Sequence, residues 1–262
     1  MTKTLFGHGL GHTLTALLLS GALVATTASA HDFFLRPPVP PVLVGETVEV
    51  QATVSSIFPG FDIAVTLDRI RSYQVRGVER ATFEVAGVGA KSLKFRFSAP
   101  RNGLAILGLD LKPRDIDYPE DRVDLIMEEY EVDPAAAAAV AGLPHPRTLK
   151  VVSTRFAKSF VCVGNCGDRS AARKPLGYDL EFVASDKPGG FVLLSHGRPL
   201  SNYPVAIVNA QSERRAVRTG PDGTVVLNGP VGATMLFAAE MTAPANRAER
   251  FQLRLTSLTL SN

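Results

Sequence analysis

The sequence of 262 residues has no tryptophan, only two cysteines and no surplus of charge of either sign. Its 28 basic and 25 acidic side chains give a formal net charge of +3, and the basic ones are scattered along the chain. A nearly neutral chain without basic clusters is not expected to bind nucleic acid. After residue 30, no apolar run approaches the ~20 residues that a helix needs to cross a bilayer. We therefore expect a protein that is peripheral to a membrane at most.

The first 30 residues, 1–30, have the features of a signal peptide. A short apolar stretch at residues 14–19 is followed by small residues that end in Ala28-Ser29-Ala30, the pattern that a signal peptidase reads. Cleavage after Ala30 would leave His31 as the first residue of the exported chain, and an uncleaved anchor is the alternative. Because no cysteine stands at the cleavage site, a lipid anchor is not expected. The sequence predicts a soluble periplasmic protein.

Most of the remaining sequence predicts β-strands. Residues 47–54 alternate between apolar and polar side chains, residues 93–97 do the same, and residues 63–67 repeat the pattern. Alternation with one polar face is typical of antiparallel sheets that are half-exposed to water. Short strands separated by glycine, proline and asparagine turns indicate a sandwich.

One segment, residues 119–131, predicts an amphipathic helix instead. Its apolar residues at positions i, i+3, i+4 and i+7 are Val123, Ile126, Met127 and Tyr130. Proline at its first position and acidic residues in its first turn favour a helix start there. The other acidic residues, Glu129 among them, are expected to face solvent. A second, alanine-rich turn or two is expected to begin at Asp133 and to stop at Gly142.

The fold class that follows is mainly β, with two antiparallel β-sandwich domains of the immunoglobulin-like or transthyretin-like kind. Residues 31–168 are expected to form an amino-terminal β domain with the short inserted helix. Residues 175–262 are expected to form a smaller sandwich of about six strands. The break is placed at residues 164–176, where glycine, asparagine, aspartate, serine and arginine concentrate.

The two cysteines, Cys162 and Cys166, are four residues apart with the turn-prone Gly164-Asn165 between them. In an exported protein this spacing favours a disulfide bond. The alternatives are two free thiols or a thiolate metal site, which would need further ligands because the chain has no other cysteine.

His31 is the first candidate metal ligand. At a free amino terminus, a histidine offers the α-amine and the ring Nδ1, which together can close one chelate ring on Ni²⁺, Co²⁺ or Cu²⁺. Asp32 follows directly and is the expected auxiliary ligand. His145 and His196 are further candidates, although neither stands in a metal-ligand spacing. The alternative for each histidine is an ordinary exposed or terminal residue without a ligand.

Catalytic motifs are absent from the sequence. It contains no Gly-x-Ser-x-Gly elbow, no phosphate-binding glycine loop, no dinucleotide fingerprint and no His-Glu-x-x-His. No catalytic residue is therefore assigned, and a non-enzymatic protein is expected. The exception kept open is a copper oxidase or oxygenase that pairs His31 with His145 or His196.

Several short segments resemble one uncharacterised family of bacterial periplasmic proteins. They are residues 31–35, 45–46, 125–129, 157–161, 176–181, 197–202 and 222–223. Members are commonly described as domains of unknown function or as periplasmic components of cobalt/nickel uptake systems. The resemblance implies that His31 is the family's histidine after the leader, and that a membrane uptake system or outer-membrane receptor is the partner. Where the family often has tryptophan, this chain has Phe34.

Two functions are carried forward from the sequence. The first is a periplasmic, non-enzymatic protein that binds nickel or cobalt for uptake or delivery. The second is a structural or interaction module of the cell envelope, whose sandwich loops bind a protein or a glycan. Metal titration distinguishes the two.

Overall fold

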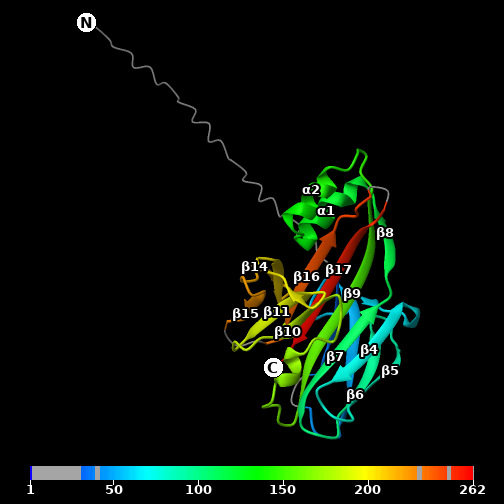
Figure 1. Cartoon of the computed structure of the whole chain (residues 1–262), viewed down its shortest axis with the longest axis vertical. Helices are drawn as coiled ribbons and strands as arrows, with labels where there is room; N and C mark the ends of the chain where they lie inside the picture. The colour runs from blue at the N-terminus through cyan, green and yellow to red at the C-terminus, as the bar shows by residue number, and fades with distance from the viewer. Residues whose placement is uncertain (2–30, 39–41, 229–231, 247–248, 262) are drawn as a thin grey trace.

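An eight-stranded sheet, called sheet B here, forms the centre of the molecule (Figure 1). The structure is a computed structural model that describes residues 1, 31–38, 42–228, 232–246 and 249–261. The predicted signal peptide lies outside the described residues. The strands of sheet B run in the order β14-β13-β16-β17-β9-β7-β4, and β8 also pairs with β9. Their bounds are β4 (Ile70–Arg76), β7 (Gly103–Leu111), β8 (Arg114–Tyr118), β9 (Leu149–Val163), β13 (Pro204–Asn209), β14 (Arg214–Arg218), β16 (Thr234–Thr242) and β17 (Phe251–Leu260).

Two smaller sheets accompany sheet B. Sheet A consists of β1 (Asp32–Arg36), β2 (Thr47–Ser55), β3 (Ile63–Ala64), β5 (Thr82–Val88) and β6 (Leu93–Ser98). Sheet C consists of β10 (Leu180–Ala184), β11 (Gly190–Ser195), β12 (Arg198–Pro199) and β15 (Thr224–Val226). The helices are α1 (Glu120–Tyr130), α2 (Pro134–Ala141) and the 3₁₀ turns η1 (Leu67–Arg69) and η2 (Ser170–Arg173). The prediction of a mainly β fold built from packed sheets is confirmed.

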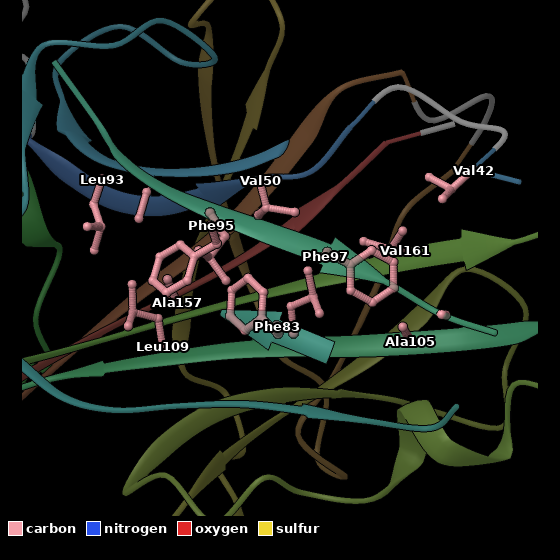
Figure 2. Packing of buried hydrophobic residues seen from close by; sticks show 14 of the residues in the cluster. Val42, Val50, Phe83, Leu93, Phe95, Phe97, Ala105, Leu109, Ala157 and Val161 are labelled. Atoms are coloured by element: carbon pink, nitrogen blue, oxygen red, sulfur yellow. The ribbon is translucent and has the colours of Figure 1, made fainter. Parts of the chain in front are cut away.

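Sheet B is covered on both faces, and β7 shows this most clearly. Ala105, Leu107 and Leu109 on β7 pack into the apolar cluster beneath sheet A (Figure 2). Leu104 and Ile106, which point the other way, pack into the cluster beneath sheet C. A strand that is buried on both faces has a continuous apolar sequence without alternation, which explains why alternation did not predict β7.

The central sheet contains strands from both predicted domains. β9, from the amino-terminal region, and β17, from the carboxyl-terminal region, pair in parallel from Val151 opposite Phe251 to Ser159 opposite Thr259. The other strand pairs of the three sheets, in the part of the chain described, are antiparallel. The two regions therefore share one continuous sheet across the predicted break at residues 164–176.

The predicted helix is present as α1. Val123 and Ile126 are almost fully buried, Tyr130 is buried, and Met127 is partly buried against the same apolar cluster. That cluster also contains side chains of β16 and β17, among them Phe237, so the stripe packs on sheet B. Within the described residues, no helix is long and apolar enough to cross a membrane.

The predicted alanine-rich turn is the short helix α2. The side chain of Asp133 caps it by accepting hydrogen bonds from the backbone N–H groups of Ala135 and Ala136, at 2.8 and 3.1 Å. Ala136 and Val140 are buried in the same cluster as α1. Gly142 ends the helix, as expected.

Among the predicted strands, residues 47–54 and 93–97 are confirmed as β2 and β6, whereas the alternation at residues 63–67 does not form a full strand. Only Ile63–Ala64 pairs with β2, and the backbone then closes a 3₁₀ turn through the Arg69 N–H to the Thr66 carbonyl. Ile63 is exposed rather than inward-facing. Among the described residues, β3 pairs only with β2 and is therefore an edge strand. The exposed Ile63 side chain thus has no neighbouring strand on its other side.

The predicted disulfide between Cys162 and Cys166 is confirmed, with the two Cα atoms 5.5 Å apart. Gly164 between them has a φ of +55°, in the left-handed region. A Cβ at this position would lie 2.0 Å from the Oδ1 atom of Asn102. The loop therefore needs glycine both for its backbone conformation and for the close approach of Asn102.

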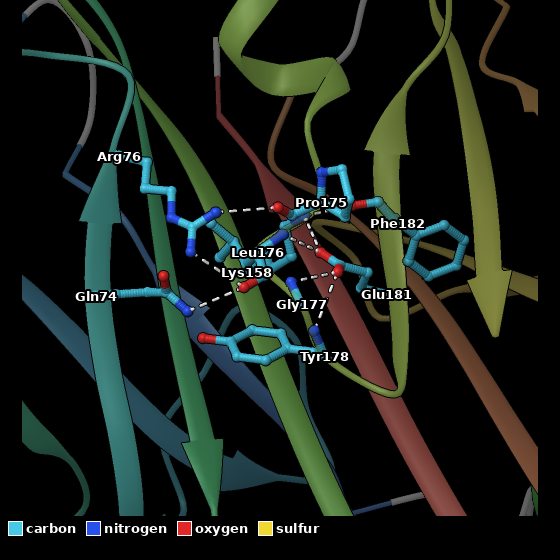
Figure 3. A network of polar contacts seen from close by, with 9 residues as sticks. All are labelled: Gln74, Arg76, Lys158, Pro175, Leu176, Gly177, Tyr178, Glu181 and Phe182. Atoms are coloured by element: carbon cyan, nitrogen blue, oxygen red, sulfur yellow. Dashed lines mark hydrogen bonds and ion pairs between the residues drawn. The ribbon is translucent and has the colours of Figure 1, made fainter. Parts of the chain in front are cut away.

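A buried ion pair joins sheet C to sheet B (Figure 3). The Nζ atom of Lys158 on β9 lies 2.7 Å from Oε2 of Glu181 on β10 and donates to the carbonyl of Phe182, also at 2.7 Å. Glu181 also accepts hydrogen bonds from the backbone N–H groups of residues 176–178. Burial lowers the pKa of Lys158, and the neighbouring Glu181 carboxylate opposes this shift. The pair is fully enclosed and has no solvent to replace a lost partner.

Replacing Ile126 by alanine should lower the free energy of unfolding by about 2–5 kcal/mol, because it leaves a cavity in a packed cluster. Glu128, on the exposed side of α1, provides the control, and Glu128→Ala should change the value by less than about 0.5 kcal/mol. Urea denaturation measures both. Equal effects from the two variants would contradict the packing of α1 on sheet B.

Replacing Lys158 by methionine should lower the free energy of unfolding by about 3–5 kcal/mol, since it leaves the Glu181 charge buried without its cation. The matched control is Lys94→Met, which breaks the exposed pair between Lys94 and Glu49 and should cost at most about 1 kcal/mol. Denaturant unfolding of the two variants gives the comparison. If both variants were equally stable, the buried pair would not be what joins sheets B and C.

Candidate functional site

The candidate site lies where β1 begins, and we call His31, Asp32, Glu129, Arg155 and Arg214 the His31 site. β1 pairs with β2, with Asp32 opposite Ser55. His31 precedes this pairing and is exposed. Its carbonyl accepts a hydrogen bond from Nη1 of Arg155, at 3.1 Å. The backbone of His31 is therefore held on β9 while its side chain remains accessible.

Asp32 is buried and paired with a residue far along the chain. Its Oδ2 atom accepts a hydrogen bond from Nη2 of Arg214 on β14 at 2.6 Å, and its side chain is only 7% exposed. The Oδ1 atom is buried without a hydrogen-bond partner among the described residues. Burial raises the pKa of Asp32 to about 6, although the Arg214 cation lowers it. The Arg214 guanidinium also lies 4.9 Å from the ring centroid of Phe237.

Glu129 brings a second carboxylate to the site from the last turn of α1. It is half-buried, and burial raises its pKa. Among the charges around it, that of His31 lowers this pKa the most, followed by that of Arg214. Glu129 also lines a small hollow together with Arg214 of β14 and Phe237 of β16, so α1 places it beside the arginine that binds Asp32. The next residue, Tyr130, is buried against sheet B and holds this turn in place.

His145 and His196 have other partners. His145 is on the loop between α2 and β9, and its Nδ1 atom lies 3.3 Å from Oε2 of Glu120. His196 is in the turn between β11 and β12, and its Nδ1 atom lies 3.5 Å from Oδ1 of Asp179. Both side chains are more than half exposed. The structure thus pairs each of these candidate histidines with a single carboxylate.

Within the described residues, no group of three or more histidine, cysteine, aspartate or glutamate side chains lies close enough to hold a metal ion. The donor set expected at His31 is of another kind, because one of its two nitrogens is the α-amine that cleavage after Ala30 would create. Asp32, the predicted auxiliary ligand, has its side chain turned into the protein and bound to Arg214. Glu129, which lines the same hollow as Arg214, is a second carboxylate near this pair that the sequence pattern did not assign to the site. The sequence feature that could have indicated its partial burial is its position directly before Tyr130, at the border of the apolar stripe.

Fold and site together define a mainly β protein with an accessible histidine anchored at the edge of its sheets. Residues 28–243 match the family described as a domain of unknown function (DUF4198), and the chain belongs to this family. No curated protein matches the sequence. A solved structure, the D0-D1 domain of intimin, is similar at 11% identity over 89% of this chain and 99% of that chain. Its TM-score of 0.23 is too low to support an argument about architecture or function.

Replacing Asp32 by alanine should lower the free energy of unfolding by about 1–3 kcal/mol, because the Arg214 guanidinium loses its carboxylate partner and β1 loses a tie to β14. Glu84→Ala, an exposed carboxylate on β5, is the control and should change stability by less than about 0.5 kcal/mol. Thermal and urea unfolding measure both. A neutral Asp32→Ala variant would mean that the buried pair does not hold β1.

Proposed function

We propose that the protein is an exported periplasmic protein that binds a transition-metal ion at His31 and serves nickel or cobalt uptake or delivery. The α-amine and the ring Nδ1 of His31 are the two nitrogen donors, and the Glu129 carboxylate is the auxiliary ligand. The role is binding and transfer to a membrane uptake system, without catalysis.

The observation that carries the proposal is the combination of a fixed backbone and a free side chain at His31. The His31 carbonyl is bonded to Arg155, and the next residue is locked by the pair between Asp32 and Arg214. Neither contact uses a ring nitrogen of His31, and the ring is exposed. A donor held in place before the ion arrives loses less conformational freedom on binding.

The chemistry of the donors suits ions of the later first transition series. Amine and imidazole nitrogens favour Ni²⁺, Cu²⁺ and Zn²⁺, while a single carboxylate adds negative charge to balance the ion. The intrinsic affinity order for such ligands is Co²⁺ below Ni²⁺ below Cu²⁺. We assign the auxiliary role to the Glu129 carboxylate because it lines the same hollow as Arg214, whereas the Asp32 carboxylate is bound to Arg214.

The test is calorimetric titration of Ni²⁺ and Cu²⁺ into exported protein whose intact mass shows that it begins at His31. One ion should bind per chain, with Cu²⁺ bound more tightly than Ni²⁺. His31→Ala removes the ring nitrogen, and one extra residue before His31 displaces the amine from the chelate. Either change should abolish detectable binding, and Glu129→Gln should weaken it by about 10- to 100-fold.

His145→Ala and His196→Ala are the controls, and both should bind the ions as the unaltered protein does. Thermal unfolding of the metal-free variants should be nearly unchanged, because the hydrogen bond that holds His31 in the described structure uses its carbonyl and not its ring. Failure of the processed protein to bind either ion would reject the proposal. Binding that persists in both His31 variants would reject it as well. The remaining hypothesis would then be the interaction module that binds a protein or glycan.

A further inference from the structure

A cavity of about 440 Å³ opens where sheet C meets the end of sheet B. It shares no lining residue with the His31 site. Its apolar lining includes Leu104, Phe160, Phe191, Leu227 and Leu260. All five belong to the apolar cluster between sheets B and C or pack against it, and the rings of Phe160 and Phe191 lie 6.4 Å apart. The cavity is thus an opening at the edge of a hydrophobic core, and an apolar group placed there would extend that core.

The rim of the cavity carries three cations, of which two are paired. Arg173 is bonded to Asp186 at 2.8 Å, and Lys187 is bonded to Asp222 at 2.8 Å. The guanidinium of Arg169 has no carboxylate partner in the described part of the chain. One planar cation therefore remains beside the apolar part of the cavity lining, where it can bind a carboxylate through two parallel hydrogen bonds.

The loop that presents Arg169 is fixed at both ends. On one side, the disulfide ties Cys166 to Cys162 of β9, and both cysteines line the cavity. On the other side, the Arg169 carbonyl accepts a hydrogen bond from the backbone N–H of Ala172 and begins η2. Because this loop is already ordered, a ligand would lose little affinity to arranging it.

We propose that this cavity binds a small amphipathic monoanion, with an apolar chain inside and a carboxylate on Arg169. Its volume lies within the range of small-molecule sites, which are mostly apolar and fix their ligand with few polar groups. The single unpaired cation matches a ligand with one negative charge. A medium-chain carboxylic acid has this chemistry.

The absence of tryptophan from the chain provides a direct reporter of occupancy. Leu227→Trp places an indole in the cavity lining, whereas Val226→Trp places it at the adjacent residue, which is exposed and does not line the cavity. Titration with decanoate at low salt should shift the emission of the first variant in a saturable manner. The emission of the second variant should not respond.

The charge of the ligand is tested by Arg169→Gln in the Leu227→Trp background. Its affinity for decanoate should fall about tenfold, the effect of losing one charge-assisted contact, while its affinity for uncharged decanol should not change. The control is Arg198→Gln, which removes an exposed arginine of β12 outside the cavity and should leave both affinities unchanged.

Occupancy itself is tested by Ala184→Phe, which fills the cavity and should abolish binding of both ligands. Thermal unfolding shows whether each variant is folded. If Ala184→Phe does not fold, Arg169→Gln provides the test, because Arg169 is exposed and its substitution leaves the core unchanged. Absence of saturable decanoate binding would overturn the proposal. Equal affinity for decanoate in Arg169→Gln and Arg198→Gln would also overturn it.

Discussion

The arrangement of the sheets depends on the ion pair between Lys158 and Glu181. Two opposite charges buried together are tolerated only when their remaining hydrogen-bonding groups are satisfied. Here Lys158 also donates to Phe182, and Glu181 also accepts from the backbone of residues 176–178. The carbonyl of Leu176 in that segment in turn accepts from Gln74 on β4 (Figure 3). Sliding sheet C along sheet B would break all of these contacts at once, so the pair defines a single docking position.

The same central position explains which strands could be predicted from the sequence. β2 and β6 of sheet A each have one face that is more exposed to solvent, so the alternation at residues 47–54 and 93–97 identified them. β7 is covered on both faces, and its apolar run carries no period that distinguishes a strand from a buried helix. The parallel pairing of β9 with β17 joins residues about 100 positions apart, as in Val151 with Phe251, and no local pattern encodes it. The helix stripe was predictable because its spacing is local.

The candidate site also combines features that the sequence predicts with features that arise only from non-local contacts. The position of His31 after a leader-like segment is a property of the sequence alone, and the fold adds that this residue is exposed. The pairing of Asp32 with Arg214 spans 182 positions, so no local pattern in the sequence could predict that this carboxylate binds an arginine. Glu129 was placed among solvated acids because helix periodicity assigns a face but does not say what else packs beside that face. The end of α1 lies beside Arg214 of β14 and Phe237 of β16, and these contacts are non-local.

β1 itself shows why the His31 site is formed by folding rather than by a ligand. Phe33 and Phe34 are successive residues that point to opposite sides of the strand, and each is buried in a different apolar cluster. The Phe33 carbonyl also accepts a hydrogen bond from the buried Ser257 hydroxyl of β17, at 2.7 Å. Each buried phenylalanine contributes about 1.5–3 kcal/mol. The strand is thus held by core packing on both sides, and His31 is positioned at its end whether or not an ion is bound.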